Sequence, residues 1–216
     1  MCGACGAGRS GPRWEDSLGM PTRAALQARA AAAGRLLGAG ARLRVRPWFA
    51  AGYLLADRVG RSTHVTELDS LWHTAGEWGA ALPGWEPGSG DPVTVQVDLI
   101  PDPDALAVWL AAVAHLGRPD GLELRLSDPA RDRTVVARLA PGTVDVDLAP
   151  CALGVDLAPC AVGVDLAPRA VAVDLAPCAV TAGTAPAGDS ASVRGRGAAE
   201  AARHLSRHLA GELSSR

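Results

Sequence analysis

The amino-acid sequence predicts an α+β protein of two small modules, each with a helix, three strands and a helix, the second enlarged by an antiparallel β-meander. Three observations predict this fold class. Apolar residues recur at helical spacing in some segments and at every second position in others. Residues 79–92 are rich in Gly and Pro, which is typical of a linker between modules. A nine-residue unit, VDLAPCAVG, is copied four times in tandem over residues 146–181.

The first module, residues 22–78, follows an N-terminal tail, residues 1–21. Apolar residues at helical spacing predict a helix over 22–37, and two glycines directly after it favour its end there. Alternating patterns predict strands over 42–46, 53–57 and 61–65, with a turn at Gly60. The closing helix is predicted to be capped by Thr66, with Asp69 three residues on as in a capping box, and to present an apolar face as far as Trp78.

The second module, residues 93–181, is predicted to open with a strand over 93–99. A helix follows, with Asp102 as its cap, Pro103 in its first turn and Gly117 just past its end. This helix is apolar around most of its circumference, so it should be buried. Strands over 122–126 and 134–139 lead into the repeat. Residues 182–197 are predicted to be a flexible linker, and residues 198–216 to hold a final helix.

Each copy of the repeat divides into five alternating residues, typical of a strand, and a four-residue turn that contains proline. An antiparallel pairing through that turn keeps Val and Leu on one face in every copy. The preceding segment, 137–145, fits the same register, so a native hairpin is the predicted template for the duplication. The alternative is a disordered array, because a proline at every ninth residue weakens a β-ladder.

Composition excludes some chemistry and divides the charge unevenly. The chain has no lysine, which excludes a P-loop lysine, a Schiff-base lysine and the β3 lysine of kinases. The first 66 residues hold ten arginines and three acidic residues, whereas the remainder holds eleven arginines and twenty acidic residues. Such asymmetry predicts either a nucleic-acid or phosphate surface in the first module or docking of the two halves on each other.

An arginine-rich strand is the best candidate for a nucleic-acid or phosphate site. Arginines at 42, 44 and 46 alternate with Leu43 and Val45, so guanidinium groups line one face of the strand. The candidate residues are Arg42, Arg44, Arg46, Trp48, Arg58 and Arg61. The order of helix, three strands and helix resembles double-stranded-RNA-binding domains, but Glu67 and Asp69 stand where such domains are basic. The competing interpretation is a solvated face, or a face docked on the acidic second module.

Four residues form a candidate zinc site. Cys2 and Cys5 have the CxxC spacing, and His204 and His208 are four residues apart on the last predicted helix, so each pair can supply two ligands. The competing interpretation of the histidines is a solvated helix flank. A thiol-dependent enzyme at Cys2 or Cys5 is a further hypothesis. Asp69, His73 and Glu77 share one helix face, and the pattern favours a solvated polar stripe over an acid–base cluster.

The leading hypothesis is a non-enzymatic cytoplasmic interaction or accessory protein. It follows from the missing catalytic motifs and the uneven charge, and zinc bound at the N-terminal CxxC is compatible with it. A protein partner or intramolecular docking is favoured over nucleic acid, which is the alternative through the arginine strand. A membrane is not expected, because no stretch approaches the ~18 apolar residues of a membrane span. A signal peptide's apolar core is also missing from the first 30 residues.

Overall fold

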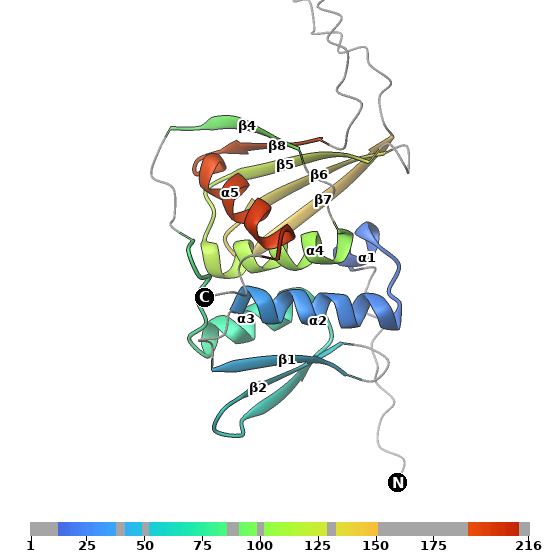
Figure 1. Ribbon diagram of the computed structural model, residues 1–216, viewed down its shortest axis with the longest axis vertical. Helices are drawn as coiled ribbons and strands as arrows, with labels where there is room; N and C mark the ends of the chain where they lie inside the picture. Colours follow the sequence, from blue (N-terminus) through green and yellow to red (C-terminus); the bar gives the residue numbers. More distant parts are fainter. Residues whose placement is uncertain are drawn as a thin grey trace, which may run out of the picture.

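The computed structural model describes residues 13–37, 42–48, 52–85, 91–98, 102–128, 133–150 and 190–211. The described chain combines helices with two antiparallel sheets, which confirms the predicted α+β class. In Figure 1 its elements form four layers: the three-stranded sheet, a helix layer of α2 and α3, a helix layer of α4 and α5, and the five-stranded sheet.

The three-stranded sheet forms one outer layer of the molecule. Its strands are β1 (Leu43–Pro47), β2 (Tyr53–Asp57) and β3 (Ser62–Val65), paired antiparallel in that order. The helices α2 (Arg23–Leu37) and α3 (Leu68–Glu77) contact it. The predicted helix, three strands and helix of the first module are therefore confirmed, with ends that differ by one or two residues.

The five-stranded sheet forms the opposite outer layer. Its strands are β4 (Val93–Asp98), β5 (Leu122–Asp128), β6 (Arg133–Ala140), β7 (Thr143–Pro150) and β8 (Ser190–Gly195), in the order β4-β8-β5-β6-β7. The helix α4 (Pro103–Ala112) continues into a π-helical turn, η1 (Val113–Gly117), and α5 (Ala198–Leu209) packs against β4 and β8. Asp102 caps α4 as predicted, because its carboxylate accepts a hydrogen bond from the Asp104 amide.

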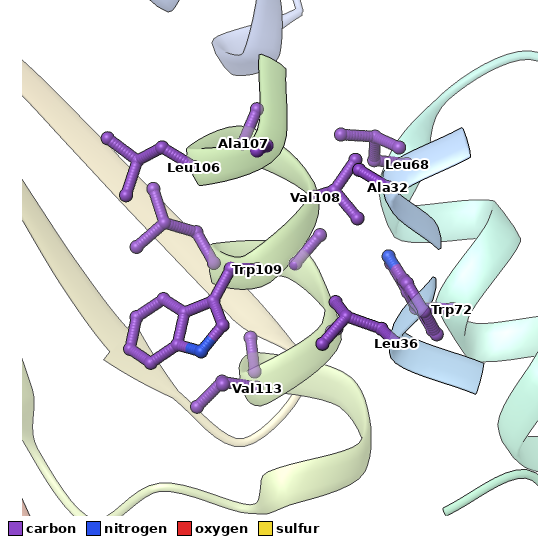
Figure 2. Close-up of a cluster of buried hydrophobic side chains, with 14 of the residues drawn as sticks. Ala32, Leu36, Leu68, Trp72, Leu106, Ala107, Val108, Trp109 and Val113 are labelled. Carbon is purple, nitrogen blue, oxygen red and sulfur yellow. The ribbon is translucent and has the colours of Figure 1, made fainter. Parts of the chain in front are cut away.

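The hydrophobic core lies on both sides of α4. Every residue from Ala105 to Ala114 is buried, as the apolar sequence of this helix predicts. Figure 2 shows Leu106 and Trp109 directed toward the five-stranded sheet and Val108 directed toward Leu36 and Trp72 of the other helix layer. A helix that is apolar all round is stable here because two layers cover it.

The segment 182–197, predicted to be a flexible linker, contains the strand β8, so that prediction is wrong for residues 190–195. The strand pairs with both β4 and β5, and its Ala191 and Val193 are buried on the core face. This strand consists of small residues and one valine, whereas most strands are recognised in a sequence by bulky β-branched residues. Flanking glycines and serines gave this segment the composition of a linker.

The hairpin of β6 and β7 contains the first five residues of the repeat. Leu139 pairs with Val144 and Ala137 with Val146 across a tight turn in which Gly142 has φ of 72°. This is the register predicted for a strand, turn and strand of the repeat type. The later copies, from residue 151 onward, lie outside the described residues, so the meander itself stays a prediction.

Candidate anion-binding face

The register of the three-stranded sheet places two arginines on its outward face. Arg46 lies beside Leu54, which lies beside His64; two residues along β1, Arg44 lies beside Ala56, which lies beside Ser62. The intervening residues, such as Val45 and Leu55, pack against the hydrophobic core. The alternation read from the sequence therefore separates an apolar inner face from an arginine-bearing outer one.

A shallow hollow of about 360 Å³ lies on this outward side, lined by Arg44, Arg46, Leu54, Ala56, Asp57 and Arg58. We refer to Arg44, Arg46 and Arg58, with the floor of Leu54 and Ala56, as the arginine face. Among the described residues, none of its three guanidinium groups has an ion pair. The Asp57 carboxylate is occupied, because it accepts hydrogen bonds from the Val59 and Arg61 amides and pairs with the Arg61 side chain at 3.6 Å.

Outward arginines of the five-stranded sheet have a different environment. Arg125 and Arg194 contact Glu123 at 2.7 and 2.9 Å, which holds the pKa of that carboxyl below its ordinary value despite burial. Arg138 pairs with Asp145 at 3.3 Å and with Asp147. These charges are matched within the fold, whereas those of the arginine face have no ion pair with any residue of the described ranges.

The other predicted arginines are not part of this hollow. Arg42 lines a separate hollow of about 270 Å³, together with Leu43 and Trp78. The Arg61 guanidinium stacks on the Trp78 ring, 3.9 Å from its centroid. Of the six candidate residues, the structure therefore brings Arg44, Arg46 and Arg58 together and turns Arg42 and Arg61 toward Trp78.

Trp48 lies just beyond the end of β1 and is 39% exposed. Its ring centroid is 6.0 Å from that of His64, so Trp48 lies next to the row formed by Arg46, Leu54 and His64. The backbone here depends on Gly52, whose φ is 109° and whose carbonyl accepts a hydrogen bond from the Trp48 amide. A Cβ atom at residue 52 would lie 2.2 Å from the Val65 carbonyl oxygen, so only glycine fits.

Docking of the arginine face on the acidic second module, one of the interpretations of the sequence, is wrong for the described residues. The helices α2 and α3 separate the two sheets, and it is α2 and α3 that contact α4 of the second module (Figure 1). The arginine face points away from that interface.

His204 of the candidate zinc site is buried and bound on both ring nitrogens. Its Nδ1 accepts a hydrogen bond from Trp109 Nε1 at 3.0 Å, and its Nε2 lies 3.2 Å from the Pro83 carbonyl oxygen. An indole N–H only donates and a carbonyl only accepts, so Nδ1 carries the lone pair and Nε2 the proton. No lone pair is left for a metal ion, and burial lowers the pKa of this imidazole.

His208, one turn further along α5, is also buried, so the solvated-flank interpretation of the two histidines is wrong. Its Nε2 donates to the Ala105 carbonyl at 3.0 Å, and burial lowers its pKa to about 4. Cys2 and Cys5 lie outside the described residues, so zinc at the CxxC stays a prediction. Within the described ranges, no group of three or more His, Cys, Asp or Glu residues is placed to hold a metal ion.

Asp69 joins three elements, which the sequence did not predict. Its Oδ2 accepts a hydrogen bond from Trp14 Nε1 at 2.9 Å, and its Oδ1 lies 3.2 Å from Nε2 of His115 in the π-helical turn. His73 and Glu77 are exposed, with side chains 67% and 62% accessible. The predicted solvated stripe is confirmed for His73 and Glu77 and is wrong for Asp69.

A short helix in the predicted N-terminal tail, α1 (Trp14–Leu18), carries a buried carboxylate that the sequence analysis missed. Glu15 is 1% exposed, and both its oxygens accept from the Leu68 amide at the start of α3, at 3.3 and 3.2 Å. The predicted Thr66 cap is therefore wrong: no side chain of its own segment caps α3, and the Thr66 carbonyl accepts from Arg13. Burial raises the pKa of Glu15 to about 7.

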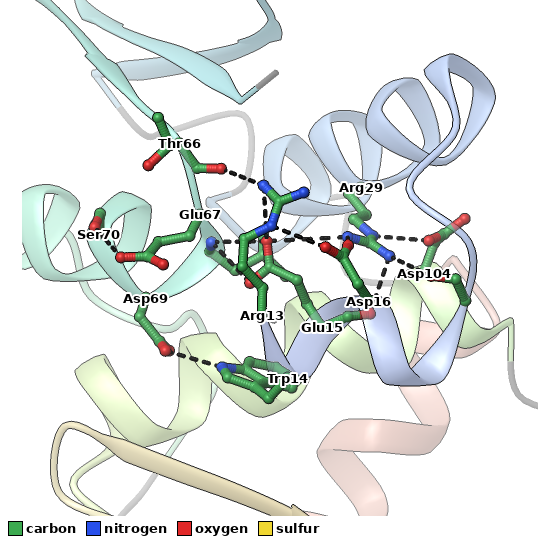
Figure 3. A network of polar contacts seen from close by, with 12 residues as sticks. Arg13, Trp14, Glu15, Asp16, Arg29, Thr66, Glu67, Asp69, Ser70 and Asp104 are labelled. Carbon is green, nitrogen blue, oxygen red and sulfur yellow. Dashed lines mark hydrogen bonds and ion pairs between the residues drawn. The ribbon is translucent and has the colours of Figure 1, made fainter. Parts of the chain in front are cut away.

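Arg29 of α2 lies at the centre of the same network and is 1% exposed (Figure 3). It contacts Asp104 at 2.8 Å and Asp16 at 3.2 Å, and it donates to the Glu15 carbonyl at 3.1 Å. The network ties α1 to α2 and α4. Arg29 follows Leu26 by one helical turn, so it stands on the apolar side of α2. A charged residue at such a position was the sequence signal for a buried ion pair.

The three comparisons with known proteins give no relative: no family model, no curated protein and no solved structure matches the chain. Among the helices that the structure describes, none has both the length and the apolar character needed to cross a membrane.

Proposed function

We propose that the protein is a non-enzymatic binding protein that binds nucleic acid on the arginine face. The observation that carries the proposal is the outward placement of Arg44, Arg46 and Arg58 around an apolar floor, without ion pairs among the described residues. Guanidinium groups present planar forks of donors that match phosphate oxygens, and a phosphate backbone supplies several such anions in a row.

An acidic protein surface is the second candidate partner, since carboxylates also fit guanidinium groups. The sequence favoured a protein partner or intramolecular docking over nucleic acid, and the contacts between the two modules run through α2, α3 and α4 rather than through the arginine face. Nucleic acid is preferred because three arginines surround the apolar floor of Leu54 and Ala56, while Asp57, which also lines the hollow, is paired with Arg61.

Replacing Arg44 and Arg46 together by Gln is expected to weaken nucleic-acid binding by about tenfold or more at low salt, because two charge-assisted contacts to phosphate are lost. The slope of log affinity against log salt concentration should also fall by about 2, one for each phosphate contact. Fluorescence anisotropy of a labelled oligonucleotide, titrated at several salt concentrations, measures both quantities.

The matched control replaces Arg203 and Arg207 of α5 by Gln, which removes the same charge from a helix packed on the other sheet. This control should bind like the unchanged protein. Equal weakening in both variants would mean that net charge alone governs binding. No salt-dependent binding by the unchanged protein would rule out the proposed function.

A further inference from the structure

We infer that the ligand of the arginine face is a single-stranded nucleic acid, with its sugar–phosphate backbone along β1 and its bases over Leu54 and Ala56, toward Trp48. The inference rests on the proposed function and adds the form of the nucleic acid and its orientation. Three features of the face support it.

The first feature is the line of charge. Arg44 and Arg46 lie two residues apart on β1, which is the edge strand of its sheet, so their Cα atoms are separated by ~7 Å along the strand. Arg58 follows at the β2 end of the same hollow. The positive charge therefore lies along one side of the face. A single line of charge matches the one phosphate backbone of a single strand, whereas a duplex presents two backbones.

The second feature is the surface beside that line. Leu54 and Ala56 are half-buried and lie between the arginines of β1 and the residues of β3. Trp48, which is 39% exposed, lies next to this surface, with its ring 6.0 Å from that of His64 and tilted by 49° to it. Unpaired bases carry apolar faces that stack on aromatic rings and cover apolar surface, and bases paired in a duplex do not offer those faces.

The third feature is the position of the helices. A protein usually reads the major groove of a duplex with an inserted helix or two-stranded ribbon. Here α2 and α3 lie behind the sheet, between it and α4. The arginines of β1 lie on the sheet face rather than at the tip of the β2–β3 hairpin, which carries the exposed Val59. The arrangement fits a strand lying flat on the sheet.

The test uses the full chain and four probes of one length and label: single-stranded DNA, single-stranded RNA, duplex DNA and poly-glutamate. We expect each single strand to bind at least about tenfold more tightly than the duplex, and poly-glutamate to bind more weakly than the duplex. Trp48→Ala should weaken single-strand binding roughly fivefold to hundredfold, and Trp48→Tyr should restore most of it. Val59→Ala, which trims another exposed apolar residue, is the control and should change nothing.

Circular dichroism of each variant checks that the fold is retained. Duplex binding as tight as single-strand binding would overturn the inference and leave the proposed function standing. Single-strand binding that is unchanged in Trp48→Ala would overturn the stacking arrangement. Binding of poly-glutamate in preference to every nucleic acid would overturn both the inference and the proposed function.

Discussion

Replacing Arg29 by Met should lower the free energy of unfolding by about 3–5 kcal/mol, the loss typical of a buried ion pair that is deprived of one partner. Methionine keeps most of the apolar stem of the side chain, so the expected loss comes from the charge and its hydrogen bonds. For a chain of this size, the melting temperature should fall by on the order of 10 °C.

The large expected loss of stability follows from the number of groups that Arg29 contacts. It neutralises Asp104 and Asp16 and lies 3.9 Å from the buried Glu15 carboxylate, while its other nitrogen donates to the Glu15 and Gly19 carbonyl oxygens. Without it, these carbonyl groups lose this donor, and among the described residues Glu15 keeps only Arg13, at 4.0 Å, as a nearby cation. The attachment of α1 to the rest of the fold should weaken with it.

Arg23→Met is the matched control, because Arg23 is exposed on the same helix. Thermal and urea unfolding should place this control within about 0.5 kcal/mol of the unchanged protein. Glu15→Gln combined with Arg29→Met should cost less than the sum of the single changes, since removing the buried carboxylate removes part of the penalty. An Arg29→Met protein as stable as the control would show that the network of Figure 3 contributes nothing to stability.

Glu15→Gln should become more stable relative to the unchanged protein as the pH rises from 4.5 to 7. The folded-state pKa of Glu15 is about 7, above its ordinary value of 4.5, because burial outweighs the Leu68 amide and the nearby arginines. Between these pH values the folded chain holds one more proton than the unfolded chain, so its free energy of unfolding falls as the pH rises. The full difference is about 3 kcal/mol and is complete above pH 7.

His208 contributes with the opposite sign. Burial lowers its pKa from 6.5 to about 4, so between these values the unfolded chain holds the extra proton and the free energy of unfolding rises with pH. The pKa of His204 is lowered too, and it acts in the same direction. The contributions of Glu15 and His208 therefore oppose each other between pH 4.5 and 6.5, so the pH dependence of the unchanged protein reports neither one alone.

Urea unfolding of Glu15→Gln and of the unchanged protein, measured at pH 4.5, 6 and 8, separates the two contributions. The difference between the proteins should grow across the series by up to about 3 kcal/mol. Gln27→Ala, an exposed change on α2 that involves no titrating side chain, should show a constant difference. A constant difference for Glu15→Gln as well would contradict a buried carboxylate with a raised pKa.

Local patterns predicted the helices and strands that carry strong apolar periodicity. The strand β1 and the fully apolar α4 are examples, because their burial follows from the side chains themselves. The strand β8 was missed, because Ala191 and Val193 become core residues only when β4 and β5 flank them. The cap of α3 was misassigned for a similar reason: its partner, Glu15, lies 53 residues away in the chain.

The candidate site was predictable in part. Alternation along residues 42–46 showed that Arg44 and Arg46 share a face, and it could not show whether that face meets solvent or the second module. That distinction required the layer order of the fold. The floor of Leu54 and Ala56 and the contact of Trp48 with His64 required strand register, which depends on pairing across the sheet.

The measurement that tests the central claim most directly is a map of amide chemical shifts during titration with a single-stranded oligonucleotide. Binding on the arginine face predicts shifts concentrated at Arg44, Arg46, Leu54 and Ala56, and little change in β4 and α5. Shifts concentrated in β4 and α5, with those of β1 and β2 unchanged, would contradict the assignment of nucleic-acid binding to this face.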